Sequence, residues 1–122
     1  MMMQTSNQQL ESNVNLIAKE LENGIRITKD NIDEWNEVYE IGDMVNGWDY
    51  LANVLDITYK VNSSRAYKSA ELLVAFGGPN IYIDTDKREV QGYWGCDKFV
   101  RRYWEDPMDI DEVCEEMYQQ AG

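Results

Sequence analysis

The chain has 122 residues, enough for one domain with a buried core, and 43% of them are hydrophobic, which excludes a wholly disordered protein. It carries 23 acidic and 11 basic residues, no histidine and a net charge of −12, so phosphate backbones and anionic lipids would repel it. We therefore expect neither direct nucleic-acid binding nor a membrane partner, and no apolar run approaches the ~20 residues needed to cross a bilayer.

The first half of the chain has the spacing of amphipathic helices. Apolar residues recur every three or four positions in three stretches, residues 9–23, 30–40 and 44–55. Gly24 and Gly42 are expected to end the first two helices. The predicted buried stripe of the second helix is Ile32, Trp35, Val38 and Tyr39, and that of the third is Val45, Trp48, Leu51, Ala52 and Leu55.

Strand patterns follow from residue 56 onward. The predicted strands are residues 56–61, 71–76, 80–85 and 89–95, and the last two form a hairpin. Residues 98–104 extend the sheet or begin a helix, and we favour the strand. A final helix over residues 107–119 would bury Ile110, Val113, Cys114 and Met117.

These elements predict an α+β domain, an antiparallel sheet of three to five strands with N-terminal helices and a C-terminal helix packed on it. Residues 1–8 are expected to be a flexible tail, and residues 9–122 a single domain. The start of the chain lacks the basic and apolar regions of a secretory signal, so we expect a cytoplasmic protein with reduced cysteines.

The acidic residues are concentrated in two blocks. Residues 30–56 contain eight acidic and no basic side chains, and residues 105–122 contain seven acidic and none basic. The segment between them has eight basic and five acidic residues. Selection for solubility alone would mix the signs more evenly, so the blocks favour a charged recognition surface over a merely solvated one, although the latter stays an alternative.

Within the two acidic helices the carboxylates are expected to point away from the apolar stripes. On the second helix they are Asp30, Asp33, Glu34, Glu37 and Glu40, and on the last helix Asp111, Glu112, Glu115 and Glu116. Carboxylates three or four positions apart on a helix lie about 5–6 Å from each other, similar to the spacing of phosphates along a DNA strand. The two faces therefore predict a DNA-mimicking surface for a basic protein.

The aromatic pair Tyr93 and Trp94 in the segment QGYWG has two interpretations. Both residues would serve as binding anchors if they were exposed together. Alternation on a strand would instead place one in the core and one on the surface. We include both among the predicted partner-binding residues.

Catalytic and metal-binding patterns are not found in the sequence. Without histidine there is no Ser-His-Asp triad and no histidine-bearing metal site, and two cysteines 18 positions apart do not form a zinc site. There is also no phosphate-binding glycine loop. We therefore predict a protein that is not an enzyme and has no catalytic residues, cofactor or metal.

The stretches VAFGGPNIYIDT (74–85) and REVQGYWG (88–95), followed by a short acidic helix ending near Tyr118, resemble a family of small proteins of phages, plasmids and integrative elements of Gram-positive bacteria. The resemblance covers roughly the C-terminal half of the chain. It implies a mobile-element setting. Small acidic proteins of that setting are similar in style to anti-CRISPR and antirestriction inhibitors, which occupy the nucleic-acid channel of a nuclease.

Together these features predict a non-catalytic inhibitor of a host defence nuclease, in the first place an anti-CRISPR protein against a type II Cas nuclease. Its partner would be a basic surface of a CRISPR effector nuclease or of another nucleic-acid-binding protein, in the cytoplasm of a bacterial host cell. Three alternatives stay open: an immunity protein for a nuclease toxin, a structural or interaction protein of a mobile element, and a nucleic-acid-binding module that uses the basic middle segment.

Overall fold

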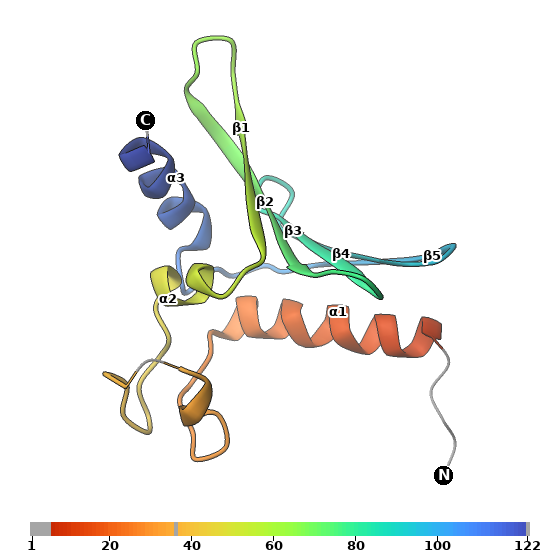
Figure 1. The fold of residues 1–122 in the computed structure, drawn as a ribbon, viewed down its shortest axis with the longest axis vertical. Helices are drawn as coiled ribbons and strands as arrows, with labels where there is room; N and C mark the ends of the chain where they lie inside the picture. The colour runs from red at the N-terminus through yellow and green to blue at the C-terminus, as the bar shows by residue number, and fades with distance from the viewer. Residues whose placement is uncertain (1–5, 36, 122) are drawn as a thin grey trace.

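The computed structural model describes residues 6–35 and 37–121. Its elements in chain order are α1 (Ser6–Asn23), a 3-10 turn η1 (Ile32–Glu34), α2 (Gly47–Ala52), β1 (Asp56–Val61), β2 (Tyr67–Ala75), β3 (Asn80–Asp84), β4 (Glu89–Trp94), β5 (Asp97–Arg102) and α3 (Ile110–Ala121). The five strands form one antiparallel sheet in the order β1-β2-β3-β4-β5, so each strand pairs with the next along the chain (Figure 1). The predicted α+β class is confirmed, with a helix at each end of the chain and five strands.

The core lies between one face of the sheet and the helices. Leu72, Ile83 and Val90 are cross-strand neighbours on this face, and all three are fully buried. α1 packs under β4 and β5, while α3 packs on β2 beside the β1–β2 hairpin (Figure 1). The other face of the sheet has no described helix packed on it, and it carries Leu73 and Tyr82.

α1 approaches the sheet closely because β4 has a glycine beneath it. An added Cβ at Gly92 would lie 2.5 Å from Val14 Cγ2 and 2.7 Å from Leu10 Cδ1, so a larger residue would push the helix away. The apolar residues at three- and four-residue spacing along this helix face the core, since Leu10, Val14, Ala18 and Leu21 are buried and Ile17 is half-buried. α1 begins at Ser6, so residues 6–8 are helical and not part of a tail, and residues 1–5 lie outside the described residues.

The predicted second helix is wrong. Between α1 and α2 the chain forms a long loop with a single helical turn, η1, and residue 36 lies outside the described residues. The two ends of the loop are joined by a backbone hydrogen bond from Ile27 to Asp43 of 2.7 Å and by an isolated bridge between Arg26 and Met44. Ile27, which is 1% exposed, anchors this base in the core.

Side chains of the loop also bind its backbone groups. The Asn31 Oδ1 accepts a 2.8 Å hydrogen bond from the Thr28 amide, and its Nδ2 donates to the Arg26 carbonyl at 2.9 Å. The Asp43 carboxylate accepts from the Glu40 amide at 2.9 Å. A helix over residues 30–40 would use the Glu40 amide internally, and here the short side chain of Asp43 takes it instead.

The third predicted helix is shorter than expected and the last begins later. Asn46 caps α2 by accepting a 2.8 Å hydrogen bond from the Asp49 amide, so the helix begins at Gly47. Trp48 and Leu55, which were predicted to be buried, are 41% and 60% exposed. Asp106 Oδ1 accepts from the Ile110 amide at 3.0 Å, at the start of α3. The predicted strand over residues 98–104 is confirmed as β5.

Among the described residues, no helix combines the length and the apolar character that a bilayer crossing requires.

Candidate functional site

The two acidic blocks of the sequence meet at one end of the molecule (Figure 1). The first block runs through the loop and α2, and the second leads into and through α3, which contacts α2. Gly47 is essential to this contact, because an added Cβ there would lie 2.4 Å from the Met108 carbonyl oxygen and 3.0 Å from Val113. We call the loop of residues 28–46, α2 and residues 105–121 the acidic end.

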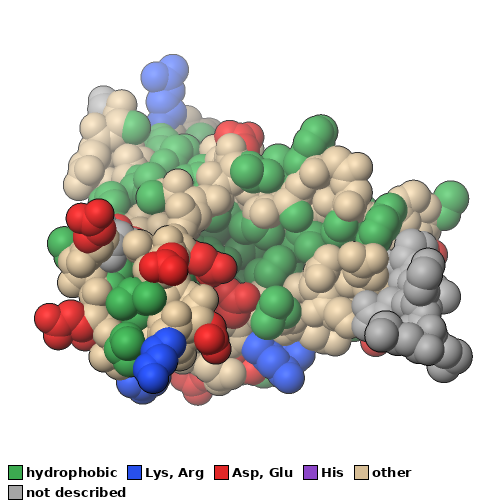
Figure 2. Space-filling view, turned by 60° about the horizontal axis from the view of Figure 1, so that its bottom comes forward, with side chains coloured by type: hydrophobic (Ala, Val, Ile, Leu, Met, Phe, Trp, Pro, Cys, Tyr) green, Lys and Arg blue, Asp and Glu red, His purple; other side chains and the backbone are tan. Residues whose placement is uncertain are grey.

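Acidic side chains gather over this end on the left of Figure 2, the side on which the loop, α2 and α3 lie in Figure 1. Between described residues there is one ion pair, Lys60 with Glu71 at 3.9 Å, and it lies on the sheet. No described carboxylate of the acidic end is therefore paired with a described lysine or arginine. Lys29 is the one basic residue in the sequence of the acidic end, so the negative charges dominate there and produce a field that attracts a cationic surface.

The predicted carboxylates of the loop are exposed, but they do not share a helix face. All five of these carboxylates are exposed. Asp33 and Glu34 belong to η1, and the others lie in the rest of the loop: Asp30, Glu37 and Glu40. The regular helical spacing proposed for them is wrong for the reason given above, since the segment is not a helix. The five loop carboxylates are nevertheless all exposed and all acidic.

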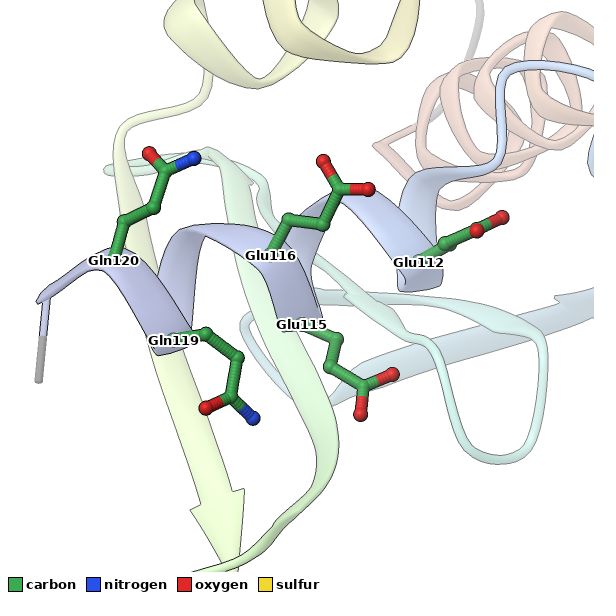
Figure 3. A pocket seen from close by; sticks show the side chains of 5 residues that line it. All are labelled: Glu112, Glu115, Glu116, Gln119 and Gln120. Atoms are coloured by element: carbon green, nitrogen blue, oxygen red, sulfur yellow. The ribbon is translucent and has the colours of Figure 1, made fainter.

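On α3 the predicted outward direction is confirmed for three of the four carboxylates. Glu112, Glu115 and Glu116 are exposed and, with Gln119 and Gln120, line a shallow hollow of 370 Å³. In Figure 3 Glu112, Glu116 and Gln120 lie on one side of this hollow and Glu115 and Gln119 on the other, all on the same exposed face of α3. Because Glu112 and Glu116 are four positions apart on a true helix, the spacing of about 5–6 Å applies to this pair.

Asp111 is half-buried and its carboxylate is directed to the sheet, so the outward direction predicted for this residue is wrong. Its carboxylate accepts a 2.7 Å hydrogen bond from the Tyr67 hydroxyl on β2. Burial raises the pKa of Tyr67, and the hydrogen bond to Asp111 raises it further. The ring of Tyr118 packs at 5.3 Å from that of Tyr59 and at 6.0 Å from that of Tyr67. Asp111 therefore fixes α3 to the sheet.

Tyr93 and Trp94 lie on β4, away from the acidic end, and point to opposite faces of the sheet. Tyr93 is on the face without a helix, in an edge-to-face contact with Tyr82 at 6.1 Å and with the Lys98 ammonium 5.5 Å from its ring centre. Trp94 packs against the core. The alternation of one surface and one core residue is confirmed, and the pair does not form a joint anchor.

A groove that the sequence analysis missed lies between α1, the loop, α2 and β2. It has a volume of 230 Å³ and is lined by Ile17, Glu20, Ile25, Trp35, Tyr50, Asn53, Val54 and Val74. We call it the Glu20 groove. Its lining comes from four separate parts of the chain, so no local pattern could have revealed it. Hydrophobic side chains also form a continuous area in the middle of Figure 2, beside the acidic end.

Glu20 is the one carboxylate in the lining of this groove. It is half-buried on α1, and burial raises the pKa of its carboxyl, with the nearby Glu34 raising it further. In the described part of the chain it has neither a hydrogen-bond donor nor a basic partner.

Of the two thiols, the buried one offers little reactivity. Cys114 is buried in α3, and burial followed by the charges of Asp111 and Asp106 raises its pKa to about 12, so it stays a thiol. Cys96 is exposed. No group of three or more potential ligands that could hold a metal ion occurs within residues 6–35 and 37–121.

The features that this structure offers for recognition are thus the acidic end and the Glu20 groove beside it. Comparisons of the chain with protein-family models, with curated proteins and with solved structures give no match.

Proposed function

We propose that this protein is a non-catalytic inhibitor that covers the nucleic-acid-binding surface of a nuclease with its acidic end. The observation that supports the proposal is the convergence of the two acidic blocks through the α2–α3 contact, with no described ion pair at that end to neutralise them. Two blocks far apart in sequence are thus joined where α2 contacts α3. Solubility alone would not require the fold to bring them together.

The mechanism is steric and electrostatic occlusion. Lysine and arginine side chains that hold phosphates on the nuclease would instead contact carboxylates of the loop and of α3. Complementary charge speeds association and selects the site, while apolar contacts slow dissociation. The carboxylates assigned to this contact are Asp30, Asp33, Glu34, Glu37, Glu40, Glu112, Glu115 and Glu116.

We propose that the protein mimics the negative charge and the shape of DNA more closely than the regular spacing of its phosphates. Only α3 carries carboxylates at helical spacing, and the loop presents its own carboxylates along an irregular backbone. A loop can follow the contour of a positively charged channel more closely than a rigid helix. This revises the two-helix surface expected from the sequence.

As partner we propose a type II CRISPR effector nuclease in the bacterial cytoplasm. The support is the resemblance of residues 74–95 to small mobile-element proteins, which stays a prediction. An immunity protein for a nuclease toxin would use the same acidic end, so the experiment must include both classes of nuclease.

The direct test measures DNA cleavage by a purified type II Cas nuclease with its guide RNA, by a toxin nuclease and by pancreatic DNase, each with increasing amounts of this protein. The proposal predicts inhibition of the Cas nuclease at near-stoichiometric amounts, with loss of DNA binding and no effect on DNase. Inhibition of the toxin nuclease alone would support the immunity function. Binding of the protein itself to DNA at physiological salt would contradict both.

A further inference from the structure

The Glu20 groove combines an apolar floor, two aromatic residues and one carboxylate. Ile17, Val54 and Val74 supply the aliphatic surface, and Trp35 and Tyr50 supply the rings. The pairing of β2 with β3 has a register shift between Leu73 and Ala75. Val74, which lies at this shift, lines the groove. Its volume of 230 Å³ suits a single long side chain and not a large cofactor.

The carboxylate in the groove has no compensating charge. Burial disfavours the charge on Glu20, the nearby Glu34 disfavours it further, and no described cation is paired with Glu20. A half-buried carboxylate without a partner reduces stability, so its presence beside apolar side chains points to an external cation.

We propose that the Glu20 groove binds an arginine side chain of the protein partner, an inference that rests on the proposed binding of a basic protein surface. The aliphatic part of the arginine would lie on Ile17, Val54 and Val74. Its guanidinium would lie beside Trp35 and Tyr50 and form an ion pair with Glu20.

Arginine fits this lining better than lysine does. Its guanidinium is planar, packs on aromatic rings and is less strongly hydrated than an ammonium, and it can donate two parallel hydrogen bonds to one carboxylate. The groove lies next to the acidic end, since Trp35 directly follows Glu34 on the loop. A basic partner drawn to the acidic end would therefore bring its arginines to the groove, where one inserted side chain would act as an anchor.

The test uses small probes and does not need the partner. N-acetyl-arginine-methylamide and its neutral isostere N-acetyl-citrulline-methylamide are titrated into the ¹⁵N-labelled protein, and NMR shifts are followed at the Trp35 indole N–H and at the Val54 and Val74 amides. Three proteins are compared: the wild type, Glu20→Gln, and Glu11→Gln. The last is a control, because Glu11 is an exposed residue of the same helix and its change alters the net charge equally.

The expected result is binding of the arginine probe about fivefold tighter than the citrulline probe in the wild type and in Glu11→Gln, which corresponds to one partly screened ion pair. In Glu20→Gln the two probes should bind equally. Equal binding of both probes to the wild type would overturn the inference. So would arginine shifts confined to α3 or to residues 28–34. Neither failure would affect the nuclease inhibition predicted for the acidic end, which is measured separately.

Discussion

The loop of residues 28–46 and α3 are both strongly acidic and both have amphipathic spacing, yet only one of them is a helix. α3 buries Ile110 and Cys114 completely, packs on β2, and is fixed by the Tyr67–Asp111 hydrogen bond. The loop has no sheet beneath it to bury a comparable stripe, and Val38, predicted to be inward, is 75% exposed. Like-charge pairs destabilise a helix by a few tenths of a kcal/mol each, so an acidic helix persists where tertiary packing outweighs them.

The largest expected difference between the two regions is in the free energy of unfolding after truncation of one isoleucine in each. Ile110→Ala removes a fully buried side chain and should cost about 3 kcal/mol, whereas Ile32→Ala removes a half-buried one and should cost about 1 kcal/mol or less. Urea unfolding of both variants measures this directly. Equal losses would mean that the loop is as firmly packed as α3.

The contact between α3 and the sheet can be weakened through one hydroxyl group. Tyr67→Phe removes the donor to Asp111 and leaves a half-buried carboxylate without it, so the loss of stability should be about 1–2 kcal/mol. Tyr82→Phe on the other face of the sheet is the matched control, since no described hydrogen bond involves its hydroxyl, and it should change stability by less than about 0.5 kcal/mol. A loss for Tyr67→Phe no larger than that of the control would show that Asp111 does not hold α3.

The smallest effect concerns the pH dependence set by Glu20. Its folded-state pKa is raised by burial and by Glu34, so the charged form destabilises the folded protein above that pKa, and this cost disappears as the pH falls towards the ordinary value of 4.5. Glu20→Gln should therefore raise the melting temperature at pH 7 and lose this advantage near pH 4.5. Glu11→Gln, measured alongside, should show no such convergence with the wild type.

The sequence predicts the secondary structure and the buried residues correctly for the elements that pack on the sheet or belong to it. The strands, the buried stripe of α1 and the inward residues of α3 follow from periodicity, because each element packs on a neighbour that matches it. Helical spacing over residues 30–40 is misleading, because Asp43 takes the Glu40 amide and the predicted stripe is only partly buried, with Val38 exposed. For Asp111 the prediction failed because a tyrosine from β2, 44 positions away along the chain, takes up its carboxylate.

The candidate site depends on contacts between distant segments and so was only partly predictable. The charge blocks were visible in the sequence, but their meeting requires Gly47 to lie against Met108. The Glu20 groove is lined from four separate segments and has no sequence signature.

The central claim is that the acidic end, and not the net charge, recognises the partner. The most direct measurement is the association rate with the inhibited nuclease, at ~50 and ~500 mM salt, for two charge-matched double variants. One is Asp33→Lys with Glu37→Lys in the loop, and the other is Glu11→Lys with Asp86→Lys, both exposed and outside the acidic end.

The account predicts that the loop variant associates on the order of tenfold more slowly at low salt, that the control differs from the wild type by less than about twofold, and that high salt removes most of the difference. Both variants should stay folded, because none of the four side chains is buried. Equal slowing of the two variants would show that net charge alone governs binding and would contradict the account.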